Sequence, residues 1–138
     1  MKTHTTNYYN AFIEVAADCP VTTGEIPPTK GNNPSAANIQ FEMISQNPYQ
    51  FTSDDIIFSV YVTKNSLIAD ELIQAREQFF SKGQPCLRTS PLAKRYGWGI
   101  HSNEEGKIAL YGVETEEYAR LSTDETIKNI SAMRTTKK

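Results

Sequence analysis

The feature that most constrains this fold is the tetrapeptide Asn103-Glu104-Glu105-Gly106, which separates two short runs rich in apolar and small residues. Asparagine at the first place and glycine at the fourth are typical of a type I turn with a bulge, because glycine adopts a positive φ without strain. Such a turn fixes the register of the strands beside it, so that Trp98 faces Gly112 and Ile100 faces Leu110. The sequence therefore predicts a hairpin with one apolar face.

The opposite face of this hairpin carries few side chains. Its residues are Gly97, Gly99, His101, Ala109 and Tyr111. Glycine weakens a strand, so its presence indicates that something approaches the backbone closely. We expect either a ligand or a covering helix on this face, and the segment 67–82 is the candidate helix.

Capping residues predict where two helices begin. Ser35 can cap a helix over 36–46, although the apolar residues of this segment would also suit a strand. Ser90 is followed by a proline at the first helical position, which predicts a short helix over 91–95.

Two further helices follow from periodicity and capping. Apolar residues at spacings of three and four predict a helix over 67–82, with Ser66 as its cap. Thr115 can cap a short helix that ends at residue 121, and Ser122 can begin one more helical turn.

Strands are predicted from runs of β-branched and aromatic residues. The segment 8–16 is such a run, and the segment 55–63 alternates apolar residues as a strand covered on both faces would. A last short strand is expected near residues 130–133. The segment 18–34 holds too many prolines and glycines for regular structure, so it is predicted as a long loop and a second place for a site.

Length and composition fit one domain of the α+β class, with a mostly antiparallel sheet and helices packed on one side. The chain has 138 residues and a net charge of -2, so it has no overall positive field to attract a polyanion. It has neither a secretory leader nor an apolar run of roughly 18 residues, so we expect a soluble, cytoplasmic protein without a membrane partner. Residues 1–6 and 135–138 are expected to be mobile.

One stretch of the chain is basic and free of acidic residues. From Lys82 to His101 its cationic residues are Lys82, Arg88, Lys94 and Arg95. The segment Arg88-Thr89-Ser90 leads into a predicted helix start, where backbone N–H groups favour an anion and a guanidinium can hold two oxygens. The ordinary structural explanation is that Ser90 only caps the helix and that the cations complement its other end.

Catalysis and metal binding have less support in the sequence. Cys86 and His101 could act as nucleophile and base only if the fold brought them within hydrogen-bond reach. Cys19 and Cys86 are expected to be free thiols in a reducing compartment, although a disulfide between them stays open. Together with the two histidines they show no paired metal-ligand spacing, and the glycines match no nucleotide-binding motif, so neither a metal nor a cofactor is predicted.

Several stretches of the chain are distinctive: Phe12 to Ala16 with Asp18 to Pro20, Gly24 to Pro28, Tyr49 to Asp55 and, most strongly, Phe79 to Cys86 with Ser90 to Leu92 and Lys94 to His101. Through these stretches, almost the full length of the chain resembles a family of small bacterial proteins of unknown function. The resemblance implies a single bacterial-type domain and assigns no activity to any residue.

The residues therefore favour binding of a small anionic ligand or a peptide partner near the segment 83–112. The candidate binding residues are Arg88, Ser90, Lys94, Arg95, His101 and Tyr111. A small enzyme using Cys86 or His101 is the second hypothesis. Nucleic-acid binding, with Tyr96 and Trp98 among the cations, is the third and is disfavoured by the acidic net charge.

Overall fold

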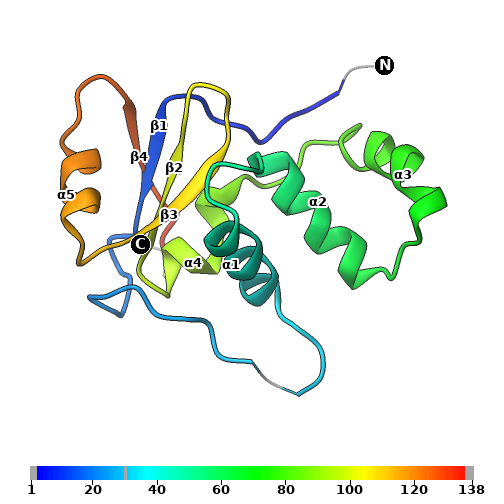
Figure 1. Cartoon of the computed structure of the whole chain (residues 1–138), viewed down its shortest axis with the longest axis horizontal. Coiled ribbons are helices and arrows are strands. Elements are labelled where there is room, and N and C mark those ends of the chain that lie inside the picture. Colours follow the sequence, from blue (N-terminus) through cyan, green and yellow to red (C-terminus); the bar gives the residue numbers. More distant parts are fainter. Residues whose placement is uncertain (1–2, 30, 136–138) are drawn as a thin grey trace.

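The computed structural model describes residues 3–29 and 31–135, which form a four-stranded sheet with helices on both of its faces (Figure 1). Its strands are β1 (Ala11–Glu14), β2 (Trp98–Ser102), β3 (Ile108–Gly112) and β4 (Lys128–Ser131). They lie in the order β3-β2-β1-β4. β1 is antiparallel to β2 and parallel to β4, and β2 is antiparallel to β3. The predicted α+β class and mostly antiparallel sheet are confirmed.

The predicted hairpin is confirmed in register as well as in position. Trp98 pairs with Gly112 and Ile100 with Leu110 across β2 and β3. Gly106 has a φ of +81°, as the turn requires. The side-chain oxygen of Asn103 accepts hydrogen bonds from the N–H groups of Glu105 and Lys107, which holds the turn closed.

The helices are α1 (Ala36–Gln46), α2 (Ser53–Lys64), α3 (Leu72–Phe79), α4 (Pro91–Lys94) and α5 (Glu116–Ser122), with 3₁₀ turns at Ala69–Glu71 and Leu87–Thr89. In Figure 1, α1 and α4 lie on one side of the sheet and α5 on the other, while α2 and α3 extend away from it. Ser35, Ser90 and Thr115 cap α1, α4 and α5 as predicted. Within the described residues, no helix combines the length and hydrophobicity needed to cross a membrane.

The two faces of the sheet have separate cores. The larger one joins apolar side chains of the strands to those of α1, α2 and α4, and it includes Ile100, Leu92 and Ile44. The smaller one consists of Phe12, Tyr118 and Leu121, with other side chains packed around them. Helices were predicted on one side of the sheet only. The smaller core adds α5 on the other side, because Tyr118 and Leu121 of that helix pack against Phe12.

Gly99 shows what the bare face of the hairpin accommodates. A Cβ atom there would overlap the Phe12 ring and would lie 2.7 Å from Tyr118 of α5. The protein's own side chains therefore fill this space. The covering helix is α5 and not the segment 67–82, which was the expected candidate.

The prediction of a strand over 55–63 is wrong, because these residues lie in α2. Thr52 caps this helix through the N–H of Asp55, and the Asp55 carboxylate accepts from the N–H of Thr52 in return. This local capping box decides between two structures that an apolar run by itself leaves open. Ile56 and Phe58 are buried in the helix.

The predicted helix over 67–82 is shorter than expected, and Ser66 does not cap it. Ser66 has a φ of +52° and its N–H donates to Thr63, so it closes the C-terminal end of α2. The next helical turn begins after Ile68, whose N–H is bound by the Glu71 side chain. α3 has no buried residue.

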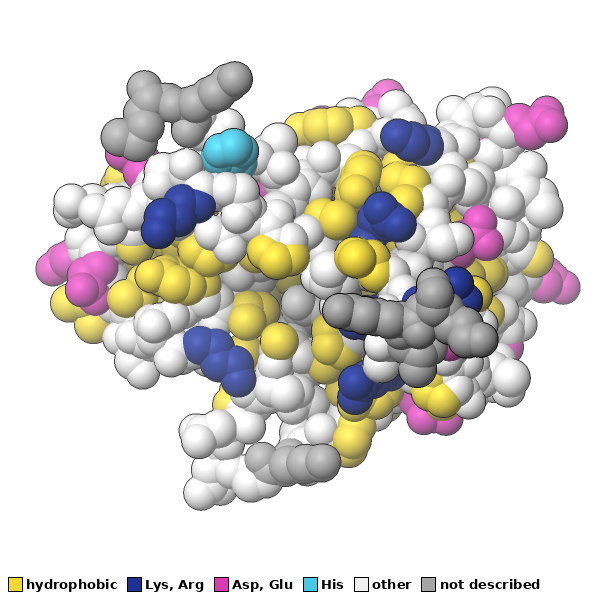
Figure 2. Space-filling view, turned by 180° about the vertical axis from the view of Figure 1, so that it is seen from behind, with side chains coloured by type: hydrophobic (Ala, Val, Ile, Leu, Met, Phe, Trp, Pro, Cys, Tyr) yellow, Lys and Arg dark blue, Asp and Glu magenta, His cyan; other side chains and the backbone are white. Residues whose placement is uncertain are grey.

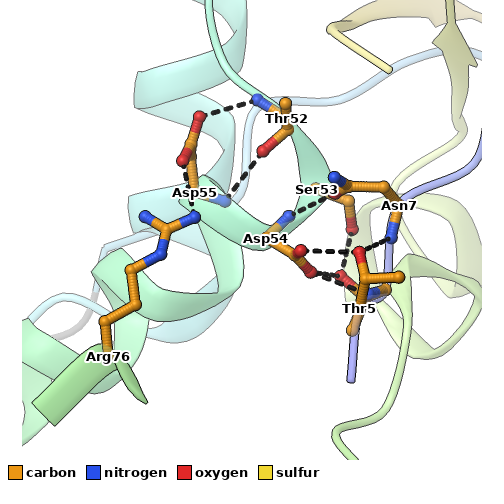
Figure 3. A network of polar contacts seen from close by, with 8 residues as sticks. Thr5, Asn7, Thr52, Ser53, Asp54, Asp55 and Arg76 are labelled. Carbon is orange, nitrogen blue, oxygen red and sulfur yellow. Dashed lines mark hydrogen bonds and ion pairs between the residues drawn. The ribbon is translucent and has the colours of Figure 1, made fainter. Parts of the chain in front are cut away.

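The segment before β1 is tied to the start of α2. The Asp54 carboxylate accepts hydrogen bonds from Thr5 and from both the N–H and the hydroxyl of Thr6, and Asn7 accepts from the N–H of Asp54 (Figure 3). Thr6 and Asp54 are buried. Of the chain ends that were expected to be mobile, residues 1, 2 and 136–138 lie outside the described part.

The C-terminal part follows the predicted order with two differences. β4 ends at Ser131, so Met133 lies beyond the strand, where its N–H donates to the carbonyl of Arg88. No further helical turn begins at Ser122. Instead, the Asp124 side chain accepts from the N–H of Thr126 and closes a tight turn.

Candidate functional site

A recess where α4 meets the start of α1 holds two of the predicted cations. Its volume is about 340 Å³, and Lys94 and Arg95 line it together with Tyr96. The opposite wall is Ser35 with the first turn of α1, and Thr89 and Pro91 complete the lining. No acidic side chain is among these lining residues. The recess therefore favours a negatively charged occupant.

Ala36 and Ala37, in the first turn of α1, line this recess, and their N–H groups have no acceptor among the described residues. The Ser35 hydroxyl caps the N–H of Asn38, so it does not reach Ala36 or Ala37. The N–H groups of Ala36 and Ala37 form no hydrogen bond with any described residue, and Ala37 is buried. Since the N-terminal end of a helix also carries partial positive charge, these donors add to the attraction for an anion.

The cations of the recess lack an ionic partner among the residues that the structure describes. Within residues 3–29 and 31–135, neither Lys94 nor Arg95 forms an ion pair. Lys94 is half-buried and Arg95 is exposed. Arg95 also borders a second hollow that contains Asp18, whose carboxylate accepts from the N–H of Thr135. Lys94 is thus the cation that faces only the acid-free recess.

Two other predicted binding residues are engaged elsewhere. Ser90 is buried, and its hydroxyl caps the N–H of Leu92 and donates to the side-chain carbonyl of Gln40 at 2.5 Å. The Arg88 side chain donates to the carbonyl of Ser131 at 2.8 Å, at the outer edge of β4. Both residues therefore bind protein groups.

His101 and Tyr111 lie on the opposite face of the sheet from α1 and α4. There Tyr49 brings them together, because its hydroxyl is 2.8 Å from His101 Nδ1 and 2.8 Å from the Tyr111 hydroxyl. Tyr49 has a φ of +59°, a conformation that bulky residues rarely adopt. Its N–H donates to the carbonyl of Ile108, which fixes this strained backbone against β3.

Burial shifts the pKa values of His101 and Tyr49. Desolvation lowers the pKa of His101, an effect that Asp124 opposes and Arg120 reinforces. Desolvation and the hydrogen bond to Tyr111 raise the pKa of Tyr49. Near neutral pH the His101 imidazole and the Tyr49 hydroxyl are therefore neutral, so neither attracts an anion.

Cys86 and His101 do not form a nucleophile and base pair in this structure. The Cys86 sulfur is 3.3 Å from the Tyr8 hydroxyl, whereas His101 is bonded to Tyr49. Both Cys19 and Cys86 are free thiols. No group of three His, Cys, Asp or Glu side chains among the described residues is arranged to hold a metal ion.

On the face that Figure 2 shows, the basic side chains do not form one continuous surface. Figure 2 shows the Lys and Arg side chains on the back of the molecule mostly separated by hydrophobic and uncharged ones. A protein that follows a nucleic-acid backbone usually presents a connected basic stripe. This face does not show one.

Comparison with known proteins assigns the chain to a family. The model of a family of unknown function, DUF6157, matches residues 3–138. The chain belongs to this family. No curated protein and no solved structure showed a significant match. The DUF6157 assignment covers nearly the whole chain, as the resemblance noted in the sequence implied, and it brings no activity with it.

Sequence reasoning about this DUF6157 chain found one wall of the recess and missed the other. Lys94 and Arg95 were predicted from the acid-free stretch. Ala36 and Ala37 carry no signal of their own, because what matters there is a free backbone N–H group. The predicted cap at Ser35 marks the start of that helix, but the packing of this helix against α4 depends on tertiary contacts that the local sequence does not show. Tyr49 was missed as well, since nothing local indicates its contact with His101.

Proposed function

We propose that this protein binds a small anion bearing a carboxylate or phosphate group in the recess between α1 and α4. The observation that carries the proposal is that Lys94 and Arg95 line the same recess as Ala36 and Ala37, whose N–H groups have no acceptor among the described residues. An oxyanion in the recess can accept from Ala36 and Ala37 on one side and from the two cations on the other.

The composition of the recess sets the size and the kind of ligand. About 340 Å³ accommodates a small metabolite rather than a length of peptide. The Tyr96 hydroxyl, which forms no hydrogen bond with the described residues, is a further donor or acceptor at the wall. Thr89 offers an acceptor, because its hydroxyl proton is donated to the carbonyl of Cys86. Phosphate monoesters and small di- or tricarboxylates fit this set of groups.

The alternative functions receive less support from the geometry. An enzyme using Cys86 with His101 lacks the contact between the two side chains. Nucleic-acid binding lacks a connected basic surface on the face seen in Figure 2, and the Trp98 indole N–H donates to the carbonyl of Glu25. Trp98 also packs against Phe41, so it belongs to the protein interior more than to a stacking platform.

The test is a titration of the isotope-labelled protein with inorganic phosphate and, separately, with citrate. Amide resonances are followed by two-dimensional NMR, with those of Ala36 and Ala37 as the direct reporters. We expect these two resonances to shift and saturate. We also expect Lys94→Gln combined with Arg95→Gln to weaken binding roughly tenfold, since each partly exposed charge contact is worth up to about 1 kcal/mol.

The matched control is Lys82→Gln combined with Arg120→Gln, which removes the same charges from exposed positions outside the recess, with Arg120 on α5 across the sheet. It should leave the affinity within roughly twofold at fixed salt, because distant exposed charges are screened. If phosphate and citrate shift residues elsewhere, or if the control pair weakens binding as much as the recess pair, the anion does not occupy this recess.

A further inference from the structure

Another hollow, distinct from the basic recess beside α4 and from the hollow beside Asp18, lies between α1 and α2. Its volume is about 500 Å³, and one side of it is closed by Leu72 of α3. The apolar residues that line it are Pro34, Ile39, Met43, Phe58, Val62 and Leu72. Cavities of this size with mostly apolar walls and a few polar groups are typical of small-molecule sites.

The hollow stays open because α3 does not cover it. α3 has no buried residue, and only Leu72 of that helix reaches the lining. Ile39, Met43 and Val62 are consequently only half-buried. A ligand that covered these side chains would remove apolar surface from water, which is favourable by about 25 cal/mol per Å². Methionine adapts its shape readily, so the wall can fit ligands of different outline.

The charge of the lining is opposite to that of the basic recess. Glu42 is the only ionisable residue of the ten that line the hollow. It is exposed at the rim, and within the described residues it forms neither an ion pair nor a hydrogen bond. The nearest lysine along α2, Lys64, donates to the carbonyl of Pro34 instead. The hollow thus combines an apolar wall with one unpaired carboxylate.

We propose that this hollow binds an amphipathic organic cation, a primary amine with an aliphatic body. The body lies along Ile39, Met43 and Val62, and the ammonium group pairs with Glu42. Charge complementarity selects this ligand class, since a fatty acid of the same shape would place its carboxylate beside Glu42. The hollow and the basic recess both involve α1, but the hollow is lined by a different set of its residues.

The test compares n-octylamine with n-octanol and n-octanoate, three probes with the same chain and different head groups. Affinities are measured by calorimetry, and the site is mapped by the amide shifts of α1 and α2. We expect octylamine to bind about threefold to fivefold more tightly than octanol, the range of an exposed ion pair, and octanoate to bind most weakly. Glu42→Gln should remove the preference for the amine and leave octanol binding unchanged.

Glu117→Gln is the matched control, because Glu117 is an exposed glutamate on α5, across the sheet. It should leave all three affinities unchanged. Equal binding of the three probes, or equal effects of the two substitutions, would overturn the proposal. Self-association of the wild-type protein that Val62→Asp abolishes, measured by sedimentation, would show that a second copy occupies the hollow and would also overturn it. Thermal unfolding of each variant verifies that it is folded.

Discussion

The hairpin of β2 and β3 and the arm formed by α2 and α3 are built in opposite ways. In the hairpin, Ile100 and Ile108 are buried completely, and Gly99 leaves no room for even one additional carbon atom. In the arm, Ile68 is 61% exposed and Ile73 is 81% exposed. The hairpin is packed from both sides by other elements, whereas the arm meets the rest of the molecule along one side only (Figure 1).

This difference shows which parts of the protein are available for binding. Close packing fixes the hairpin and leaves no space for a ligand on its glycine-rich face. Loose packing leaves hollows beside the arm, and Leu72 of α3 lines the larger of the two proposed sites. The exposed apolar side chains of the arm, such as Ile68 and Ile73, therefore contribute less to stability and more to surface that a ligand can cover.

The largest expected effect comes from truncating one isoleucine in each region. Ile100→Ala should lower the free energy of unfolding by about 2–5 kcal/mol, because it leaves a cavity in a packed core. Ile73→Ala should change it by less than about 0.5 kcal/mol. Urea denaturation of the wild-type protein and both variants measures these changes in the free energy of unfolding. Similar losses at the two positions would mean that the arm is packed as tightly as the hairpin.

A smaller effect is expected where a side chain is added instead of removed. Gly99→Ala should cost about 1–3 kcal/mol, because the new methyl group meets Phe12 and Tyr118. Gly83→Ala is the control, since the nearest atom to its added carbon is the His4 ring at 4.0 Å. Thermal unfolding compares the two variants. A neutral Gly99→Ala would show that α5 can move away from the sheet.

The arm itself is held by the cap of α2, and this can be tested separately. Thr52→Ala removes the side-chain acceptor for the N–H of Asp55 and should cost about 1 kcal/mol. Thr63→Ala, in the last turn of the same helix, should have little effect, because the Thr63 hydroxyl forms no hydrogen bond with the described residues. Urea unfolding followed by circular dichroism measures the loss of stability in both variants. Equal losses of stability in the two variants would show that the capping box is not what stabilises this helix.

The smallest effect concerns the pH dependence of the hairpin. Because burial lowers the pKa of His101, the unfolded chain binds a proton more readily than the folded protein. The contribution of the neutral, buried His101 to the free energy of unfolding is fully present above pH 6.5, the ordinary pKa of histidine. It is lost as the pH falls through the lowered pKa of the folded protein. His101→Gln should therefore reduce the loss of stability between pH 7.5 and pH 5.5.

His4→Gln is the comparison for this measurement, since His4 is an exposed histidine near the arm. Urea midpoints at the two pH values are determined for the wild-type protein and both variants. If His4→Gln flattens the pH dependence as much as His101→Gln, the effect does not come from the buried ring.

Much of the fold could be predicted where the deciding interactions are local. The Asn103 turn set the hairpin register, and single capping residues set the starts of α1, α4 and α5. The segment of α2 was misassigned because its apolar residues are compatible with both periods, and the reciprocal bonds of Thr52 and Asp55 were not recognised. The exposed Ile68, four residues before Leu72, made α3 look longer than it is.

The candidate sites were harder to predict because they depend on contacts between distant segments. Lys94 and Arg95 could be named from the sequence, but their juxtaposition with Ala37 depends on how α4 packs against α1. Ser90 was expected to face a ligand, and it faces Gln40 because α1 covers it. Glu42 drew no attention in the sequence, since an exposed glutamate on a helix is ordinary until its apolar surroundings are known.

The position of β1 in the middle of the sheet has a consequence for how the protein is made. Ile13 pairs with Ile100 on one side and with Ile130 on the other, so both partners are synthesised long after it. While the ribosome makes the intervening helices, the apolar side chains of this strand have no sheet to enter. Late pairing of this kind slows folding and prolongs the exposure of these apolar side chains in the nascent chain, which favours its aggregation.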